Sequence, residues 1–383
     1  MNKLSFVHCA DIHTDMPLTS LGGSEKSSLR RREIRETFGG IIDIVKRQNA
    51  DLLLISGDLY EHNYTTKSTI SFINSCFEEI PGTKVFILPG NHDPYAANSY
   101  YASFKWSANV NILTPDNPYY LLEDMEACIY GMGFNSSYDN KPWDYGIKAI
   151  NTDLYNILLA HGTVDMEISR NAYNPMRSEN LDSLGMDYIA LGHFHNTMEG
   201  VGRRHCIYNP GSPEPLGFDE TGEHGIFTGG ITRQKNGQKL LEVSFVKTNK
   251  RYYENLEINI SGLDTDEQVI TRISNILDNK DAAKGLFCIT LKGYLEAGFK
   301  VDTQLVKSKA EEIAFFVKVK DETVVDYNFN DIMNEPGLKG LFTSKIFARI
   351  GKTEDEYEKR LLLKALYYGI EAIEKGEIKS IDI

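Results

Sequence analysis

Short apolar runs alternate with stretches of helical periodicity along the first two thirds of the chain. Continuous apolar runs predict buried strands at residues 4–7, 51–56, 84–88, 154–160 and 188–191. Between them, the sequence predicts helices over 30–48, 68–80 and 95–106 and a hairpin over 119–130. Apolar strands separated by helices are typical of an α/β protein whose mixed sheet begins with parallel βαβ units and is covered on both faces.

The pattern changes after a basic turn at 247–251. Strands at 252–260, 287–291 and 315–320, separated by helices at 264–277 and 301–313, predict a small α+β domain. A helix over 331–349 and another after Thr353 follow, and Thr353 and Glu356 have the spacing of a capping box. We therefore expect a sandwich-like α/β domain with helices on the outside at 1–246, an α+β domain at 252–325 and a helical C-terminal segment at 330–383.

Composition places the chain among ordinary globular proteins. Its 383 residues are 41% hydrophobic and 25% charged, and no apolar run approaches the ~18 residues that cross a bilayer. Asp11 interrupts the first apolar run before the hydrophobic part of a signal peptide would be complete. The five cysteines are far apart and include no C-x-x-C pair, which argues against disulfides and Cys-ligated zinc. We expect a cytoplasmic protein without a membrane partner.

The net charge is negative, with 41 Lys and Arg against 54 Asp and Glu. An acidic chain binds nucleic acid poorly by bulk charge, so a polyphosphate substrate requires local basic residues, bound metal or a partner protein. Arg30, Arg31 and Arg35 cluster at the start of the helix predicted over 30–48 and are candidates for contacts with substrate phosphates. The alternative is an ordinary solvated helix face, because acidic residues between these arginines partly neutralise them.

Polar residues follow each of the five apolar strands of the first domain. They are Asp11 and His13; Asp58; Asn91, His92 and Asp93; His161; and His193 and His195. Because the carboxyl ends of strands in an open α/β sheet line the ligand crevice, we expect these side chains to lie close together. Each short motif alone is common turn chemistry. Five coincidences at five strand ends are much harder to attribute to chance.

Seven of these side chains are metal ligands by type. Two carboxylates, one carboxamide oxygen and four imidazoles form a mixed nitrogen and oxygen set that suits Mn²⁺, Fe²⁺ or Zn²⁺. Seven ligands exceed the needs of one tetrahedral ion. They are sufficient for two ions about 3.5–4 Å apart that share a carboxylate, an arrangement that hydrolyses phosphoesters.

Together these motifs resemble the calcineurin-like metallophosphoesterase superfamily. The matching residues are Asp11-x-His13, Gly57-Asp58, Gly90-Asn91-His92-Asp93, His161 and Gly192-x-x-His195. The segments 57–60, 192–195 and 208–218 are similar, more narrowly, to the DNA double-strand-break repair nucleases of the SbcD and YhaO type. The resemblance covers residues 1–245. The later α+β domain resembles the capping domain of that branch only in position and size.

The resemblance also implies a role for each residue. One ion would be held by Asp11, His13, Asp58 and His195, and the other by Asp58, Asn91, His161 and His193, so that Asp58 bridges them. The ions would be Mn²⁺, the metal that such nucleases typically use. His92 would stabilise charge in the transition state or protonate the leaving oxygen, and Asp93 would orient His92 through a hydrogen bond.

One position departs from the pattern of the nuclease branch. Three residues after the bridging Asp, where that branch often has His or Asp near the substrate strand, this chain has Glu61. Glu61 is therefore a candidate for contact with the substrate. The departure leaves exonuclease and endonuclease activity both open and does not affect the predicted metal ligands.

The implied function is a DNA nuclease that acts within a repair complex, with an SbcC-like coiled-coil ATPase as its partner. The ATPase would dock beyond the capping domain, with Phe342, Ile346, Phe347 and residues 361–363 as candidate contacts; alternatively, the final helix packs on its own domain. Whether the chain forms a homodimer stays open. A phosphoesterase for small cyclic nucleotides or phosphoproteins shares the same metal core. A further alternative is a non-catalytic scaffold that has kept the fold. The presence of every expected ligand argues against it.

Overall fold

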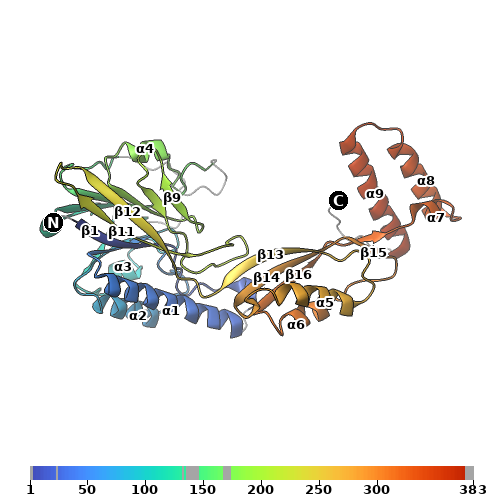
Figure 1. The fold of residues 1–383 in the computed structure, drawn as a ribbon, viewed down its shortest axis with the longest axis horizontal. Coiled ribbons are helices and arrows are strands. Elements are labelled where there is room, and N and C mark those ends of the chain that lie inside the picture. The colour runs from blue at the N-terminus through green and yellow to red at the C-terminus, as the bar shows by residue number, and fades with distance from the viewer. Residues whose placement is uncertain (1–2, 23–24, 132, 135–145, 167–173, 376–383) are drawn as a thin grey trace. The chain divides into compact units, whose positions relative to one another are not determined.

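The structure is a computed structural model that describes residues 3–22, 25–131, 133–134, 146–166 and 174–375. The chain divides into two units, Met1–Tyr253 and Glu254–Ile383 (Figure 1). All five cysteines are buried free thiols. Within the described ranges, no helix is both long enough and apolar enough to cross a membrane.

Unit 1 is a sandwich of two mixed six-stranded sheets, which confirms the predicted α/β class. The first sheet has the order β12 (Lys239–Lys247), β11 (Gly225–Arg233), β1 (Lys3–Cys9), β2 (Leu52–Ser56), β3 (Lys84–Leu88) and β4 (Val110–Ile112). The second has the order β5 (Tyr119–Leu122), β6 (Ala127–Gly131), β7 (Tyr155–His161), β8 (Tyr188–Gly192), β10 (Ile207–Asn209) and β9 (Met198–Val201).

The five predicted apolar strands are divided between these sheets. β1, β2 and β3 are parallel neighbours in the first sheet, and β7 and β8 are parallel neighbours in the second. The predicted hairpin is the antiparallel pair of β5 and β6. The carboxyl ends that carry the polar clusters therefore come from both layers of the sandwich.

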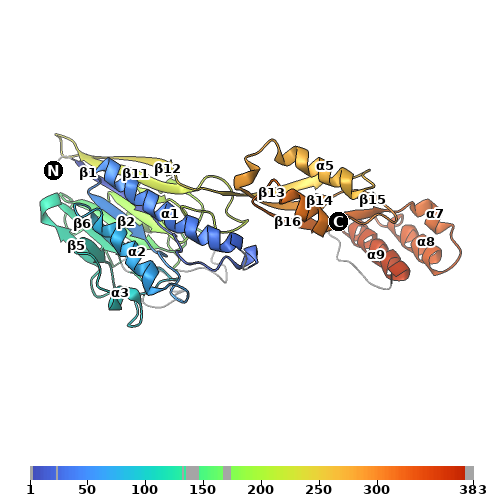
Figure 2. The ribbon, with the colours of Figure 1, turned by 90° about the horizontal axis from the view of Figure 1, so that it is seen from below.

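The core explains why both sheets have apolar strands. Alternate residues of a strand point to opposite faces, so Phe6 and Leu54 of the first sheet pack in one cluster with Ile157 and Tyr188 of the second. The other face of the first sheet is covered by α1 (Glu25–Gln48) and α2 (Lys67–Glu78), which lie side by side in both views (Figures 1 and 2). The short helix α4 (Ser178–Asp182) contributes Leu181 to a cluster that also contains residues of β7 and β8.

The helix predicted over 95–106 is a single turn, α3 (Tyr100–Ser103). Ser99 precedes it in an extended conformation, and Phe104 returns to an extended conformation immediately after it. The indole of Trp106 donates to the carbonyl of Tyr100 at 3.2 Å. The amide of Tyr95 donates to the carbonyl of Phe134 at 2.7 Å, a tertiary hydrogen bond outside the helical pattern that the apolar spacing predicts.

Unit 2 contains the predicted alternation of strands and helices. Its three-stranded sheet has the order β13 (Tyr252–Asn259), β14 (Gly285–Lys292) and β16 (Phe316–Asp321), and α5 (Asp266–Leu277) and α6 (Thr303–Ala310) connect the strands. A parallel pair, β15 (Tyr294–Glu296) and β17 (Val324–Asp326), was not predicted. The helices α7 (Phe329–Met333), α8 (Leu338–Ile350) and α9 (Glu356–Lys375) follow, and residues 376–383 of the predicted C-terminal segment lie outside the described residues.

Two predictions at the C-terminal helices are wrong. The single helix predicted over 331–349 is interrupted between α7 and α8, where Pro336 cannot donate a helical hydrogen bond and Gly337 has a φ of 109°. Thr353 does not form the expected capping box, because Asp355 accepts from the amide of Tyr357 at 2.9 Å and begins α9 instead.

Candidate metal centre

The loops after the five strands meet at one edge of the sandwich, and their backbones are hydrogen-bonded to one another. The amide of Asp11 donates to the carbonyl of Gly57 at 3.1 Å, and the amide of His13 donates to the carbonyl of Asp58 at 2.9 Å. Asp11, His13, Asp58 and His193 all have positive φ, at 51°, 50°, 52° and 94°. Such conformations are costly for non-glycine residues and concentrate at functional sites.

Two glycines of the sequence motifs make room for this packing. A Cβ on Gly57, which has a φ of +92°, would lie 2.0 Å from His161 Nδ1. A Cβ on Gly90 would lie 2.2 Å from Asp58 Oδ1. Glycine is thus required for steric reasons in the Gly-Asp and Gly-Asn-His-Asp motifs, because a larger residue at either position would displace a candidate ligand.

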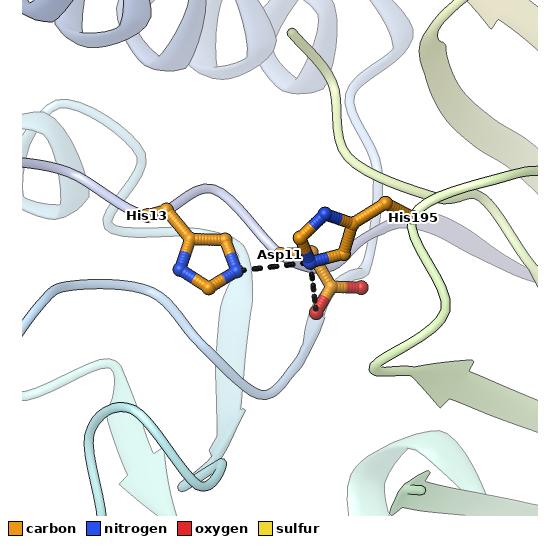
Figure 3. Close-up of side chains that lie close together, drawn as sticks. All are labelled: Asp11, His13 and His195. Atoms are coloured by element: carbon orange, nitrogen blue, oxygen red, sulfur yellow. Dashed lines mark hydrogen bonds and ion pairs between the residues drawn. The ribbon is translucent and has the colours of Figure 1, made fainter. Parts of the chain in front are cut away.

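Asp11, His13 and His195 form the first candidate group (Figure 3). His13 Nε2 lies 3.2 Å from His195 Nε2, and His195 Nε2 lies 4.0 Å from Asp11 Oδ1. The carboxylate of Asp11 is held by the amide of His193, at 3.0 and 2.9 Å from its two oxygens. Asp11 and His13 are buried, whereas His195 is partly exposed.

Asp58, His161 and His193 form the second group, and Asn91 joins them. Asn91 Oδ1 lies 3.0 Å from His161 Nε2 and 3.1 Å from His193 Nδ1. Asp58 Oδ2 lies 3.2 Å from His161 Nε2 and 3.7 Å from His13 Nε2, so it faces a ligand of each group. The seven predicted ligands are thus brought together, and Asp58 occupies the position expected of a bridging carboxylate.

The orientation of the imidazole rings fits the binding of metal ions. The Nδ1 atoms of His13, His195 and His161 face acceptors: Glu61 Oε1 at 2.7 Å, Glu220 Oε1 at 2.7 Å and the carbonyl of Ser56 at 2.8 Å. An Nδ1–H donated to each of these acceptors leaves the Nε2 atom of that ring to bind a metal ion once its own proton is lost. The Nε2 atoms face one another and the oxygens of Asp58 and Asn91, so a cation between them can take the place of their protons.

Charge coupling in the cluster follows the same contacts. Burial alone would lower the pKa of His161, but Asp58 raises it to about 9. Burial would likewise lower the pKa of His195, but Glu220 raises it to about 9. Against the effect of burial, His161 and His13 hold the pKa of Asp58 well below its ordinary value. Because ligating imidazoles must be deprotonated, metal binding here releases protons.

His92 lies close to His13 and Asp58, with which it forms a third group of potential ligands, and its side chain is 43% exposed. Its ring centroid is 4.7 Å from that of His13, and its amide donates to Asp58 Oδ1 at 2.8 Å. The acceptor that faces its Nδ1 is Glu61 Oε2, at 3.1 Å. Glu61, predicted to contact substrate, therefore contacts two histidines of the site.

The prediction that Asp93 orients His92 through a hydrogen bond disagrees with the contacts of Asp93. Asp93 is fully buried and turned toward the backbone: its Oδ1 accepts from the amide of Gly90 at 2.7 Å, and its Oδ2 accepts from the amide of Leu59 at 2.7 Å and the hydroxyl of Tyr101 at 2.6 Å. Several donors converge on one carboxylate there, and they draw it away from the imidazole. Asp93 thus joins the loops after β2 and β3.

The three candidate arginines have different environments. Arg30 is completely buried, and its NH1 lies 2.9 Å from both Glu33 and Glu214, which argues against contact with a substrate. Arg31 is partly buried and donates to the carbonyl of Pro17 at 3.1 Å. Arg35 is 41% exposed and pairs with Asp15, two residues after His13.

Glu220 contacts a candidate metal ligand, and the sequence did not reveal this contact. It is buried, accepts from the hydroxyl of Ser212 at 2.9 Å and the amide of Leu216 at 2.9 Å, and presents its other oxygen to His195. No spacing in the sequence connects position 220 with position 195. The only signal was the nearby segment 208–218, which marked the region without indicating a contact.

Three curated proteins are similar to the chain at low identity. The uncharacterized metallophosphoesterase YhaO of Bacillus subtilis is 24% identical over 369 residues, which cover 89% of this chain and 87% of YhaO. The DNA double-strand break repair protein Mre11 of Methanopyrus kandleri is 24% identical over 58% of this chain and 52% of that protein. The SbcD component of the nuclease SbcCD of Staphylococcus epidermidis is 22% identical over 40% of this chain and 48% of that protein.

The matches to Mre11 and SbcD span about half the length of those proteins, whereas the match to YhaO includes most of both chains. The sequence model of calcineurin-like phosphoesterases matches residues 4–197, the stretch that contains all seven candidate ligands and His92. The chain therefore belongs to the calcineurin-like phosphoesterase family.

Proposed function

We propose that this protein is a two-metal, Mn²⁺-dependent DNA nuclease that hydrolyses phosphodiester bonds as part of a cytoplasmic DNA repair complex. The observation that carries the proposal is the convergence of the seven candidate ligands at one edge of the sandwich, with the half-exposed His92 close to His13 and Asp58. The relatives named as a DNA double-strand break repair protein and as a component of a nuclease support DNA as the substrate.

The residues of the chain have distinct roles in this proposal. Asp11, His13 and His195 would hold one ion with Asp58, and Asp58, Asn91, His161 and His193 would hold the other. When bound, such ions supply activated water and positive charge to stabilise the transition state at phosphorus. His92 would donate a proton or hydrogen bond from Nε2 to the leaving oxygen, because Nδ1 is occupied by Glu61. Asp93 would act only by holding the loops.

The electrostatics of DNA binding need a local explanation, since the net charge of the chain is −13. Two divalent ions would add about four positive charges where the phosphate must lie. Arg31 and Arg35, both on α1, remain candidates for phosphate contacts. Arg30 is no longer a candidate, because it is buried between two carboxylates.

The deciding experiment incubates purified protein and Mn²⁺ with labelled duplex and single-stranded DNA, and in parallel with a cyclic dinucleotide and bis(p-nitrophenyl) phosphate. We expect degradation of DNA that requires Mn²⁺ and is lost in His92→Gln, while the Mn²⁺ content of that variant stays normal. Efficient turnover of small esters without cleavage of DNA would reject the nuclease and favour a small-molecule phosphoesterase.

Residues 330–383 are our candidate for the binding site of a coiled-coil ATPase, outside the nuclease domain at 1–246 and the capping domain at 252–325. Phe342, Ile346 and Phe347 pack against the buried cluster formed by Tyr327 and neighbouring helices, whereas Leu361 is 50% exposed. Leu361→Ser should therefore reduce co-purification with a co-expressed coiled-coil ATPase and spare turnover of bis(p-nitrophenyl) phosphate. Unchanged co-purification would exclude this surface.

A further inference from the structure

Glu61 contacts two functional histidines at once. Its Oε1 lies 2.7 Å from His13 Nδ1, and its Oε2 lies 3.1 Å from His92 Nδ1. The two rings meet edge to face at 85°. One carboxylate thus joins a candidate metal ligand to the residue proposed to act on the leaving group.

The backbone around Glu61 is fixed on both sides. Its amide donates to the carbonyl of Thr14 at 3.1 Å, and its carbonyl accepts from the amides of Tyr64 and Thr65 at 3.0 and 2.8 Å. The Glu61 side chain is only 10% exposed. The carboxylate is therefore held in place before any ion or substrate binds.

The count of donors and acceptors determines what this carboxylate can do. An ionised carboxylate only accepts hydrogen bonds, so both facing Nδ1 atoms must carry protons. This leaves Nε2 of His13 as the ligating atom, where it already faces His195 Nε2 at 3.2 Å. It also leaves Nε2 of the half-exposed His92 for the leaving oxygen. A hydrogen-bond partner that fixes the orientation of a ligating ring in this way typically contributes 10–100-fold to metal affinity or activity.

We propose that Glu61 is a positioning residue that orients His13 and His92 together, so that metal affinity and action on the leaving group depend on the same carboxylate. This inference rests on the proposed two-metal hydrolysis for its effect on turnover. Glu220 provides the contrast within the same site, because it contacts one candidate ligand, His195, and its other oxygen accepts from Ser212 and Leu216.

The test is Glu61→Gln, a replacement of nearly equal size. A carboxamide has one acceptor oxygen and one NH₂ donor, so it cannot accept from two Nδ1–H groups, and one ring must rotate or change tautomer. We expect the Kd for Mn²⁺, measured by EPR titration of metal-depleted protein, to rise about 10–100-fold. At saturating Mn²⁺, kcat for bis(p-nitrophenyl) phosphate should fall by a similar factor with KM nearly unchanged.

The second readout is the tautomer of each ring, from ¹H–¹⁵N spectra of histidine side chains in metal-depleted protein. Signals are assigned by their absence in His13→Gln and His92→Gln. We expect protonated Nδ1 atoms on both rings in the unaltered protein and a changed pattern on at least one ring in Glu61→Gln. Glu220→Gln is the matched control, which should leave both of these rings unchanged.

A double variant tests whether Glu61 acts through His92. At saturating Mn²⁺, Glu61→Gln with His92→Gln should turn over about as slowly as His92→Gln alone, since residues that act as a unit are not additive. If Glu61→Gln fails to fold, Glu61→Asp, which is too short to reach both rings, is measured in the same way.

Unchanged tautomers and unchanged Mn²⁺ affinity in Glu61→Gln would overturn the inference, as would a fully additive loss in the double variant. The spectra, the titration and the small diester require no DNA. Failure to cleave DNA would therefore reject the proposed nuclease alone and leave the role of Glu61 standing.

Discussion

Replacement of Asp93 by Asn distinguishes between two possible roles of this residue, orienting His92 and joining two loops. The sequence motif predicts that Asp93 orients His92, whereas the structure turns its carboxylate toward the loops that carry Asp58 and Asn91. A residue that orients His92 alone affects turnover and leaves the metal content unchanged. A residue that joins two loops affects the stability of unit 1 and the position of the bridging ligand, and so the metal content.

The expected loss of stability follows from the contacts. Oδ1 accepts from two backbone amides and Oδ2 from two amides and one hydroxyl, the donors being Gly90, Asp58, Leu59, Tyr60 and Tyr101. Asn replaces one acceptor oxygen with a donor. In its less costly orientation, two buried amides lose their acceptor. At about 1–3 kcal/mol for each unsatisfied buried donor, the free energy of unfolding should fall by about 2–6 kcal/mol.

The assay is unfolding in urea followed by tryptophan fluorescence, because Trp106 belongs to unit 1 and stacks on Tyr101, a donor to Asp93. Manganese content after gel filtration is measured on the same preparations. Tyr101→Phe is the graded control: it removes one donor and leaves the carboxylate, so we expect a loss of about 1–2 kcal/mol. His92→Gln should have little effect on stability, since the His92 side chain is half-exposed.

The alternative makes the opposite prediction. If Asp93→Asn unfolds at the same urea concentration as the unaltered protein, keeps its manganese and loses only turnover, the role in joining loops is wrong. A reduced midpoint together with reduced manganese supports it.

Two further substitutions probe the packing around the site. Gly90→Ala should lower Mn²⁺ affinity about 10–100-fold in an EPR titration, because the new Cβ would lie 2.2 Å from Asp58 Oδ1; Gly82→Ala, with no atom within 4 Å, should not change it. Arg30→Met should destabilise unit 1 by about 3–5 kcal/mol in urea, because it removes the ion pair of the buried carboxylate of Glu214, whereas Glu33 keeps its pair with Arg251. Arg32→Met, at a side chain 68% exposed, should stay within about 0.5 kcal/mol, and equal effects of the two substitutions would contradict the assignment.

The α/β class and the convergence of the ligands could be predicted because both follow from local pattern. Each apolar strand is followed directly by its polar motif, so finding the strand also finds the ligand. Asp11, Asp58, Asn91, His161 and His193 are all placed in this way, although the sequence did not indicate which sheet of the sandwich supplies each of them.

The partners of these ligands could not be predicted, because they depend on how side chains are directed after the loops have packed. Asp93 follows His92 in sequence, and proximity suggested that the two interact; instead, Asp93 accepts from backbone amides and His92 faces Glu61. Glu61 and Glu220 are 48 and 25 residues away from the histidines they hold, His13 and His195.

The difference between residue type and residue partner also explains why the convergence of the candidate metal ligands could be predicted, whereas the contacts of Arg30 and Glu61 could not. A metal ligand needs a specific side-chain chemistry, and the sequence reveals that chemistry directly. An arginine or glutamate can pair with a substrate or with another side chain, and only its burial decides between these partners. Arg30 and Glu61 have the residue types expected at a phosphate site, but the structure assigns their charges to internal partners. Function should therefore be more sensitive to the carboxylates that hold the histidines than to the arginines at the start of α1.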